Sequence, residues 1–166
     1  VRDADIKSSI TQAWHHNWFI GWRAVGGAVA NVRTLVSTVV PYGGVADKIF
    51  LMYPSLDATL ATMLVPIFNS FVVDYCVRQK ISGLTLIYFI IKQLPLLEPK
   101  AFKENCSWSP SNITLAEWFK KRTLELTYTA WDLEAFAKDC GYKGPPFRWD
   151  EERRFLLRAE LDAAFF

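Results

Sequence analysis

The sequence predicts an α+β fold, in which a small antiparallel sheet packs on long amphipathic helices and a helical C-terminal tail follows. Two observations point to this class. Short runs of β-branched and aromatic residues, separated by glycine and proline, fill residues 18–53. Apolar residues then recur every three or four positions over 56–76, and shorter helix patterns occupy 114–165. Elements of these two kinds usually bury their apolar faces against each other.

Three strand-like runs come first. The first spans 18–25 and ends at a glycine pair, and the second spans 33–40 and stops at Pro41. A turn rich in glycine leads to the third, over 48–53. Runs of this length, closed by glycine and proline, are typical of short antiparallel strands.

The longest predicted element is a helix over 56–76. Ser55 is its expected N-cap, and Asp57 lies in the first turn, where the helix dipole favours negative charge. Pro66 is expected to kink it, because proline removes one hydrogen bond of the helix. A polar elbow over 78–83 ends the helix.

The run 84–92 is expected to form a second buried element, helix or strand, that stops before Pro95. Lys92 interrupts it, and proline, asparagine and aspartate interrupt the apolar run 60–77. Neither run reaches the ~20 apolar residues that a membrane-spanning helix needs. We therefore expect no membrane partner.

A polar, proline-bearing connection over 98–112 separates these elements from a helical tail. It divides the chain into a sheet-plus-helix part, residues 1–99, and a C-terminal tail, residues 100–166.

The tail is expected to contain three helices. Thr114 caps the first, over 115–126, and Thr129 with Asp132 forms a start like a capping box for the second, over 131–139. Asp150 caps the third, on which leucine and phenylalanine form one apolar stripe: Leu157, Leu161 and Phe165.

Composition limits the classes of function. Half of the residues are hydrophobic, which excludes a disordered chain, and the net charge of +2 means that any basic face is local. The three cysteines are far apart and form no C-x-x-C pair, so we expect a reducing compartment, the cytoplasm, and neither disulfides nor zinc. The chain begins with Val1 rather than methionine and is interpreted as a fragment or processed piece.

Three patterns resemble catalytic motifs, and each has a simpler explanation. His15 and His16 are adjacent, so on a strand their rings point to opposite faces and do not converge on a metal. In Glu98-Pro99-Lys100, which resembles half of a nuclease site with Asp74 as its partner, the proline disfavours the required strand.

The third pattern is the tetrapeptide 144–147, Gly-Pro-Pro-Phe. Amino-methyltransferases carry Asn-Pro-Pro-aromatic, whose first side chain accepts hydrogen bonds from the amino group of a flipped base. Glycine offers no such acceptor, so 144–147 is interpreted as a rigid turn. The chain has no glycine-rich cofactor loop either, and we expect no catalytic residue and no cofactor in it.

Five residues are candidate DNA contacts: Arg23, Arg33, Thr34, Arg78 and Lys80. Arginine pairs with guanine or grips phosphate, and lysine neutralises phosphate. The alternative for each basic side chain is a solvated surface or a salt bridge between sheet and helix.

Two blocks carry a resemblance to a known family. The first comprises 22–23, 33–41, 69–80 and 93–95; the second comprises 125–132, 147–153 and 157–163. Together they resemble the C-terminal, target-recognition part of large adenine-specific DNA methyltransferases of restriction-modification and phage-defence systems, the type IIG-like family.

This resemblance implies a division of labour. A parent core outside this chain would bind S-adenosylmethionine and transfer the methyl group, and this part would hold double-stranded DNA and select the sequence. Its partners would be duplex DNA and the remainder of the parent methyltransferase. An alternative is a protein-interaction module that docks a methyltransferase onto other defence subunits, and a third is a stand-alone nuclease.

Overall fold

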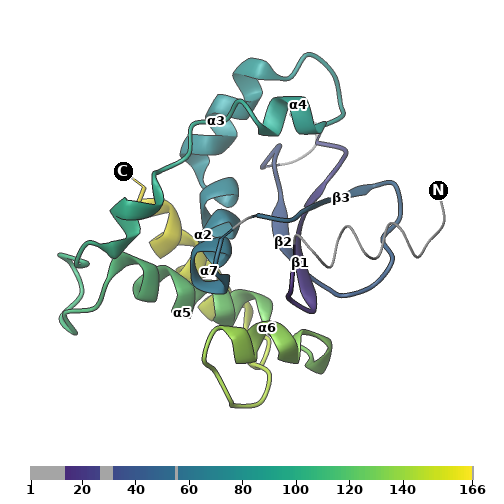
Figure 1. Ribbon diagram of the computed structural model, residues 1–166. Helices are drawn as coiled ribbons and strands as arrows, with labels where there is room; N and C mark the ends of the chain where they lie inside the picture. Colours follow the sequence, from purple (N-terminus) through teal and green to yellow (C-terminus); the bar gives the residue numbers. More distant parts are fainter. Residues whose placement is uncertain (1–13, 27–31, 55, 166) are drawn as a thin grey trace.

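The computed structural model describes residues 14–26, 32–54 and 56–165 and has the predicted α+β architecture. A three-stranded sheet lies on one side of the central helix α2 (Ala58–Asn69), and α5 (Leu115–Thr127) packs on the other side (Figure 1). The helices α3 (Phe71–Lys80) and α4 (Tyr88–Ile91) lie at one end of this layered arrangement. The helix α6 (Glu134–Asp139) lies at the opposite end.

The predicted small antiparallel sheet is confirmed, with the strand order β2-β1-β3. Its strands are β1 (Trp18–Arg23), β2 (Ser37–Pro41) and β3 (Ile49–Met52), and the central strand β1 is almost entirely buried. In the register, Ile20 faces Val39 on one side and Met52 on the other. The strand β2 begins four residues later than predicted, because the preceding amides bind a carboxylate on α3, as described below.

The long predicted helix is two helices, α2 and α3, which are bent by 66°. The break falls at Ser70, and not at Pro66, which lies inside α2. Ser70 has an extended backbone and its side chain accepts a hydrogen bond from the amide of Val73, so it caps a new helix. Asp57 was predicted to lie in the first turn of this helix, but it is the N-cap residue of α2. The predicted N-cap, Ser55, lies outside the described residues.

In the described part of the chain, no single helix has the length and hydropathy of a membrane span. The bent pair α2–α3 meets both criteria only when its two helices are counted together.

The prediction of a second buried element over 84–92 is wrong. The segment forms only the single turn α4, and Leu84, Ile87 and Phe89 are exposed. Its buried residues are Ile91 and Leu86, and the amide of Leu86 donates to the carbonyl of Ala24. Sequence periodicity alone could not separate a buried run from an apolar surface.

The backbone at Gly26 lies very close to the backbone of the segment that precedes β2. A Cβ atom added there would lie 2.2 Å from the carbonyl oxygen of Thr34 and 2.9 Å from a methyl group of Leu86. We expect Gly26→Ala to lower the free energy of unfolding by about 1–3 kcal/mol, because the backbone must move apart. Urea denaturation followed by circular dichroism measures this change.

Gly83→Ala is the matched control, since an added Cβ at that position meets no atom within 4 Å. Equal stabilities of the two variants would contradict the close approach at Gly26.

Two of the three predicted helices of the tail begin as expected. Thr114 and Glu117 form a capping box at the start of α5, and the Asp150 side chain caps α7 (Glu151–Ala163) by accepting from the amide of Arg153. Two 3₁₀ turns accompany them, η1 (Pro99–Lys103) and η2 (Trp131–Leu133).

The predicted cap of the second tail helix is wrong. Ala130, and not Thr129, is the N-cap residue of the 3₁₀ turn η2, and it makes no side-chain hydrogen bond. The helix α6 follows η2 and ends before Gly141, which has a φ of 80°.

One hydrophobic cluster contains side chains from before and after residue 99. Phe68 and Val77 belong to it with Trp118, Tyr128 and Phe136. Leu161 of α7 also belongs to it, and Phe165 packs against it. The division at residue 99 stays a prediction from sequence.

Candidate functional site: an arginine-lined groove

Two of the predicted DNA contacts, Thr34 and Arg78, belong to one buried cluster. Its centre is the carboxylate of Asp74 on α3, which is only 3% exposed. The carboxylate accepts from the amides of Thr34 (2.6 Å) and Leu35 (3.1 Å) and from Nε of Arg78 (2.7 Å). Arg78 also donates to the carbonyl of Val32 at 2.8 Å. These contacts hold the segment that precedes β2 against α3.

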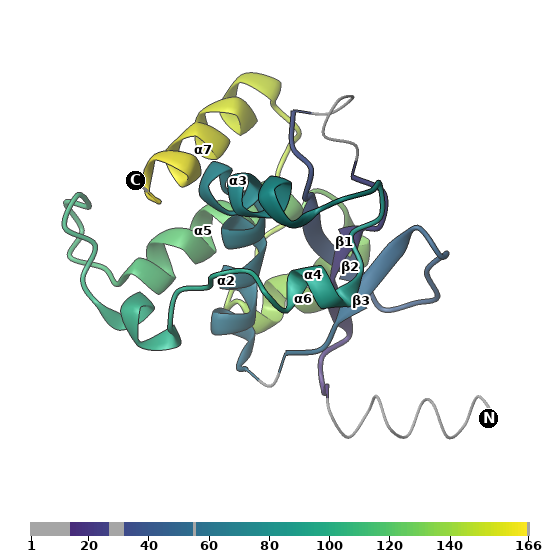
Figure 2. The same ribbon diagram turned by 90° about the horizontal axis from the view of Figure 1, so that it is seen from above.

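Arg33 joins the same segment to α7. Its guanidinium donates to the carboxylate of Asp162 and to the carbonyl of Asn69, and it lies 3.8 Å from the ring centroid of Phe71. Asp162 in turn accepts from the amide of Phe71 at 3.0 Å. One carboxylate on α7 therefore connects the start of α3 with the segment before β2; Figure 2 shows α7 beside α3.

A groove of about 840 Å³ opens beside this connection, and it brings Arg23 and Arg33 together. Its walls come from α2, α5, α7 and the segment that includes β2. Two further arginines from α7, Arg154 and Arg158, also line it. We call the hollow bounded by these four arginines the arginine groove. Among the described residues that line it, Asp162 is the one acidic side chain.

The other three predicted contacts lie outside the arginine groove. The Thr34 side chain is fully buried, Arg78 pairs with Asp74, and Lys80 is exposed in the last turn of α3. Their roles in binding DNA stay a prediction. Arg154 and Arg158 were missed, although their spacing of four places both on one face of a predicted helix.

The two arginines of α7 differ in how they are held. Arg154 donates through Nη1 to the carbonyl of Leu126 at 2.8 Å and stacks on Trp149, 3.7 Å from the ring centroid. Burial, and then the like charge of Arg158, lower the pKa of Arg154. Arg158 has a side chain that is 54% exposed and contacts Glu151 only at 3.5 Å, so it is available to a ligand.

The interior of the arginine groove is mainly apolar. Aliphatic and aromatic side chains alternate with small polar ones on its walls, among them Val36, Pro66, Leu126 and Phe155. Thr123 on α5 also lines it, and its buried Oγ1 has no hydrogen-bond partner among the described residues. Cationic edges around apolar walls suit a ligand that carries both an anionic group and an apolar face.

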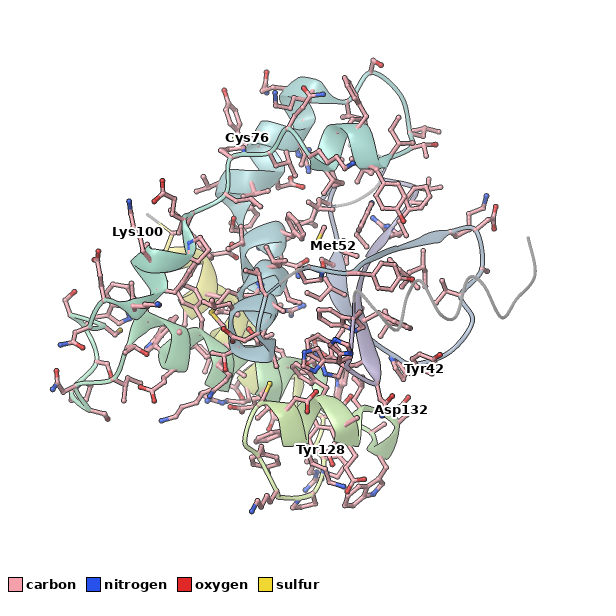
Figure 3. The ribbon with its side chains drawn as sticks, viewed as in Figure 1. Tyr42, Met52, Cys76, Lys100, Tyr128 and Asp132 are labelled. Carbon is pink, nitrogen blue, oxygen red and sulfur yellow. The ribbon has the colours of Figure 1, made fainter. Side chains whose placement is uncertain are left out.

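The motifs resembling catalytic sites do not form one in the described part of the chain. Glu98 and Lys100 pair with each other on the surface. Figure 3 shows Lys100 apart from Cys76, which lies on α3, the helix that also carries Asp74. No group of three or more metal-ligating side chains is found among the described residues. The residues 144–147 form a turn, in which Phe147 stacks on Tyr142.

His16 and Cys140 both contact side chains of other elements. His16 pairs with Asp139 through Nδ1 at 2.7 Å, and the same carboxylate accepts from the indole of Trp18. Burial raises the pKa of the Cys140 thiol to about 11, although a contact with Thr62 opposes the shift. A thiol with so high a pKa is a poor nucleophile at neutral pH.

Comparisons of the chain with protein-family models, with curated proteins and with solved structures found no match.

Proposed function

We propose that this chain is the target-recognition part of an adenine-specific DNA methyltransferase from a restriction-modification or phage-defence system. It positions duplex DNA for methylation by a core outside this chain. The observation that carries the proposal is the arginine groove, where four arginines and one aspartate meet in a chain whose total net charge is only +2. The resemblance of its two sequence blocks to that family agrees with this assignment.

The chemistry of the arginine groove supports a phosphate ligand. A guanidinium presents several donors in a planar fork that matches phosphate oxygens, and it stays charged at all physiological pH values. Four such groups from β1, the segment before β2 and α7 create a local positive potential that the overall charge does not reveal. Phosphate contacts fix the register of a protein on the duplex, and base contacts then specify the sequence.

In this proposal the other components lie outside the chain. The parent core holds S-adenosylmethionine and flips the adenine, and the remainder of the parent is a protein partner. The proposal places the chain in the cytoplasm with its DNA substrate. No residue described above is assigned a catalytic role.

Duplex binding by two charge-matched variants tests the proposal. Arg158 and Arg153 lie on the same helix, but Arg158 lines the arginine groove, whereas Arg153 pairs bidentately with Glu125 outside it. We expect Arg158→Ala to weaken binding and to reduce the slope of log K against log salt by about 0.9, the value for one lost phosphate contact. Fluorescence anisotropy of a labelled duplex at several salt concentrations measures both quantities.

Arg153→Ala removes the same charge and should leave the salt slope unchanged. An equal loss of slope in both variants would show that only total charge matters and would contradict the groove as the DNA contact.

The second candidate function, a module that docks a methyltransferase onto other defence subunits, is favoured by a different surface. Around α4 the chain exposes a set of large apolar side chains: Leu84, Ile87, Tyr88, Phe89, Leu96 and Leu97. Exposed apolar patches of this kind mark protein interfaces. Absence of duplex binding by the unmodified chain at low salt would favour this function over the first.

A further inference from the structure

We infer that the arginine groove receives one unpaired nucleotide, with its base against the apolar walls and its phosphate on the arginines of α7. The inference rests on the proposed function and deepens it, because it names the part of the nucleic acid that enters this site.

The size of the hollow fits one nucleotide. Contacts to the phosphates of a duplex require cationic side chains on a surface, and they require no cavity. The arginine groove has a volume of about 840 Å³, within the range of about 300–1,000 Å³ that is typical of sites for small organic ligands. A paired base inside a duplex has no access to such a hollow, whereas an unstacked nucleotide does.

The walls of the groove offer an aromatic side chain to a base. Phe155 lines the groove and is 62% exposed, which leaves it available as a stacking partner. Phe71, the other aromatic residue of the lining, is less exposed, and the guanidinium of Arg33 already occupies one face of its ring. Aromatic side chains stack on bases of any sequence, because every base has a π face. Phe155 is therefore the side chain assigned to the base.

The lining of the groove also contains a hydroxyl group that makes no hydrogen bond among the described residues. The hydroxyl of Thr123 is buried in the lining and has no partner among the described residues, and such groups are rare in folded proteins. The edge of a base offers both donors and acceptors, so either role of the hydroxyl finds a partner there.

Arg158 and Arg154 bind the phosphate group of the nucleotide in this assignment. In the described part of the chain Arg154 uses only Nη1 for a hydrogen bond, to Leu126, and Arg158 has a single contact at 3.5 Å. Both guanidinium groups therefore keep donors for an anion. Arg33, by contrast, is committed to Asp162 and Asn69 and forms part of the wall.

Binding of the complete chain to three small probes tests this assignment. Isothermal titration calorimetry with dAMP, deoxyadenosine and inorganic phosphate separates the base from the phosphate. We expect dAMP to bind at least about tenfold more tightly than either part alone, because only dAMP engages the ring of Phe155 and the arginines together.

The affinities of two duplexes then show whether the groove binds a nucleotide that is part of DNA or only a free nucleotide. One is fully paired, and the other carries a single extrahelical adenine nucleotide. We expect the second duplex to bind about three- to tenfold more tightly, because its unpaired base is already unstacked. A preference for dAMP without a preference for the bulged duplex would support the nucleotide chemistry but overturn DNA as its source.

Variants assign these effects to the groove. Phe155→Ala should abolish both preferences, and Leu156→Ala is its matched control, because Leu156 is an exposed neighbour on α7 outside the lining. Thr123→Val should weaken dAMP binding several-fold without lowering the thermal midpoint, since the hydroxyl that it removes has no partner.

The inference and the proposed function fail in distinguishable ways. Salt-dependent binding of both duplexes with equal affinity, together with dAMP no tighter than phosphate, would overturn the nucleotide site and leave duplex binding intact. Tight dAMP binding with no binding of either duplex would overturn the proposed function alone.

Discussion

We expect Asp74→Ala to lower the free energy of unfolding by about 3–5 kcal/mol, because it breaks a partly buried ion pair and leaves two buried backbone amides without their acceptor. The carboxylate accepts from three donors, the amides of Thr34 and Leu35 and Nε of Arg78. Alanine accepts from none of them. Urea denaturation followed by circular dichroism gives the free energy, provided that the unfolding transition is two-state.

Asp47→Ala is the control for removal of an ion-paired aspartate. Asp47 pairs with Lys48, but both side chains are largely exposed, and such pairs contribute about 0–1 kcal/mol. A loss of stability at Asp74 no larger than at Asp47 would show that the cluster does not hold the segment before β2. Asp74→Asn retains an acceptor oxygen and should fall between the two.

We expect Trp18→Ala to destabilise the protein by about 3–5 kcal/mol, the range for removal of a large aromatic side chain from a core. Trp18 is fully buried in the central strand β1. Its ring meets Phe136 of α6 edge to face at 5.1 Å, and its indole N–H donates to Asp139 at 2.8 Å. The substitution removes both the packing and the hydrogen bond between the sheet and α6, and chemical denaturation measures the loss.

Trp131→Ala is the matched control, since Trp131 in η2 is mostly exposed. Its loss should cost less than about 1 kcal/mol, as is usual for surface substitutions. Trp18→Phe keeps most of the apolar area and loses the N–H donor, so its stability should lie between that of Trp18→Ala and that of the unmodified chain. Similar losses at positions 18 and 131 would contradict the burial of Trp18.

Local signals in the sequence were sufficient for several elements. Thr114 with Glu117 and Asp150 before two glutamates are capping patterns that act over three residues, and the structure forms both caps. The three strands lie close to the predicted runs, because glycine and proline fix their ends locally. The break at Ser70 was missed, since Pro66 offered a stronger local signal than one serine.

The candidate site was only partly visible in the sequence. Arg23 and Arg33 were identified as candidate contacts, and both line the arginine groove. In the sequence Arg78 was as good a candidate for a DNA contact as these two. In the structure its guanidinium pairs with Asp74, which lies one turn earlier on the same helix. Arg154 and Arg158 are more than 120 residues away from Arg33 along the chain, and only packing brings them to the same hollow.

The sequence by itself determined the α+β class, the antiparallel strands and the caps of α5 and α7, because each follows from interactions between residues near one another in the chain. The tertiary structure alone decided which arginines share the groove, that Asp74 and Asp162 hold the segment before β2, and that 84–92 lies on the surface. These depend on contacts between residues distant in sequence, whose geometry is set by how the helices pack on the sheet.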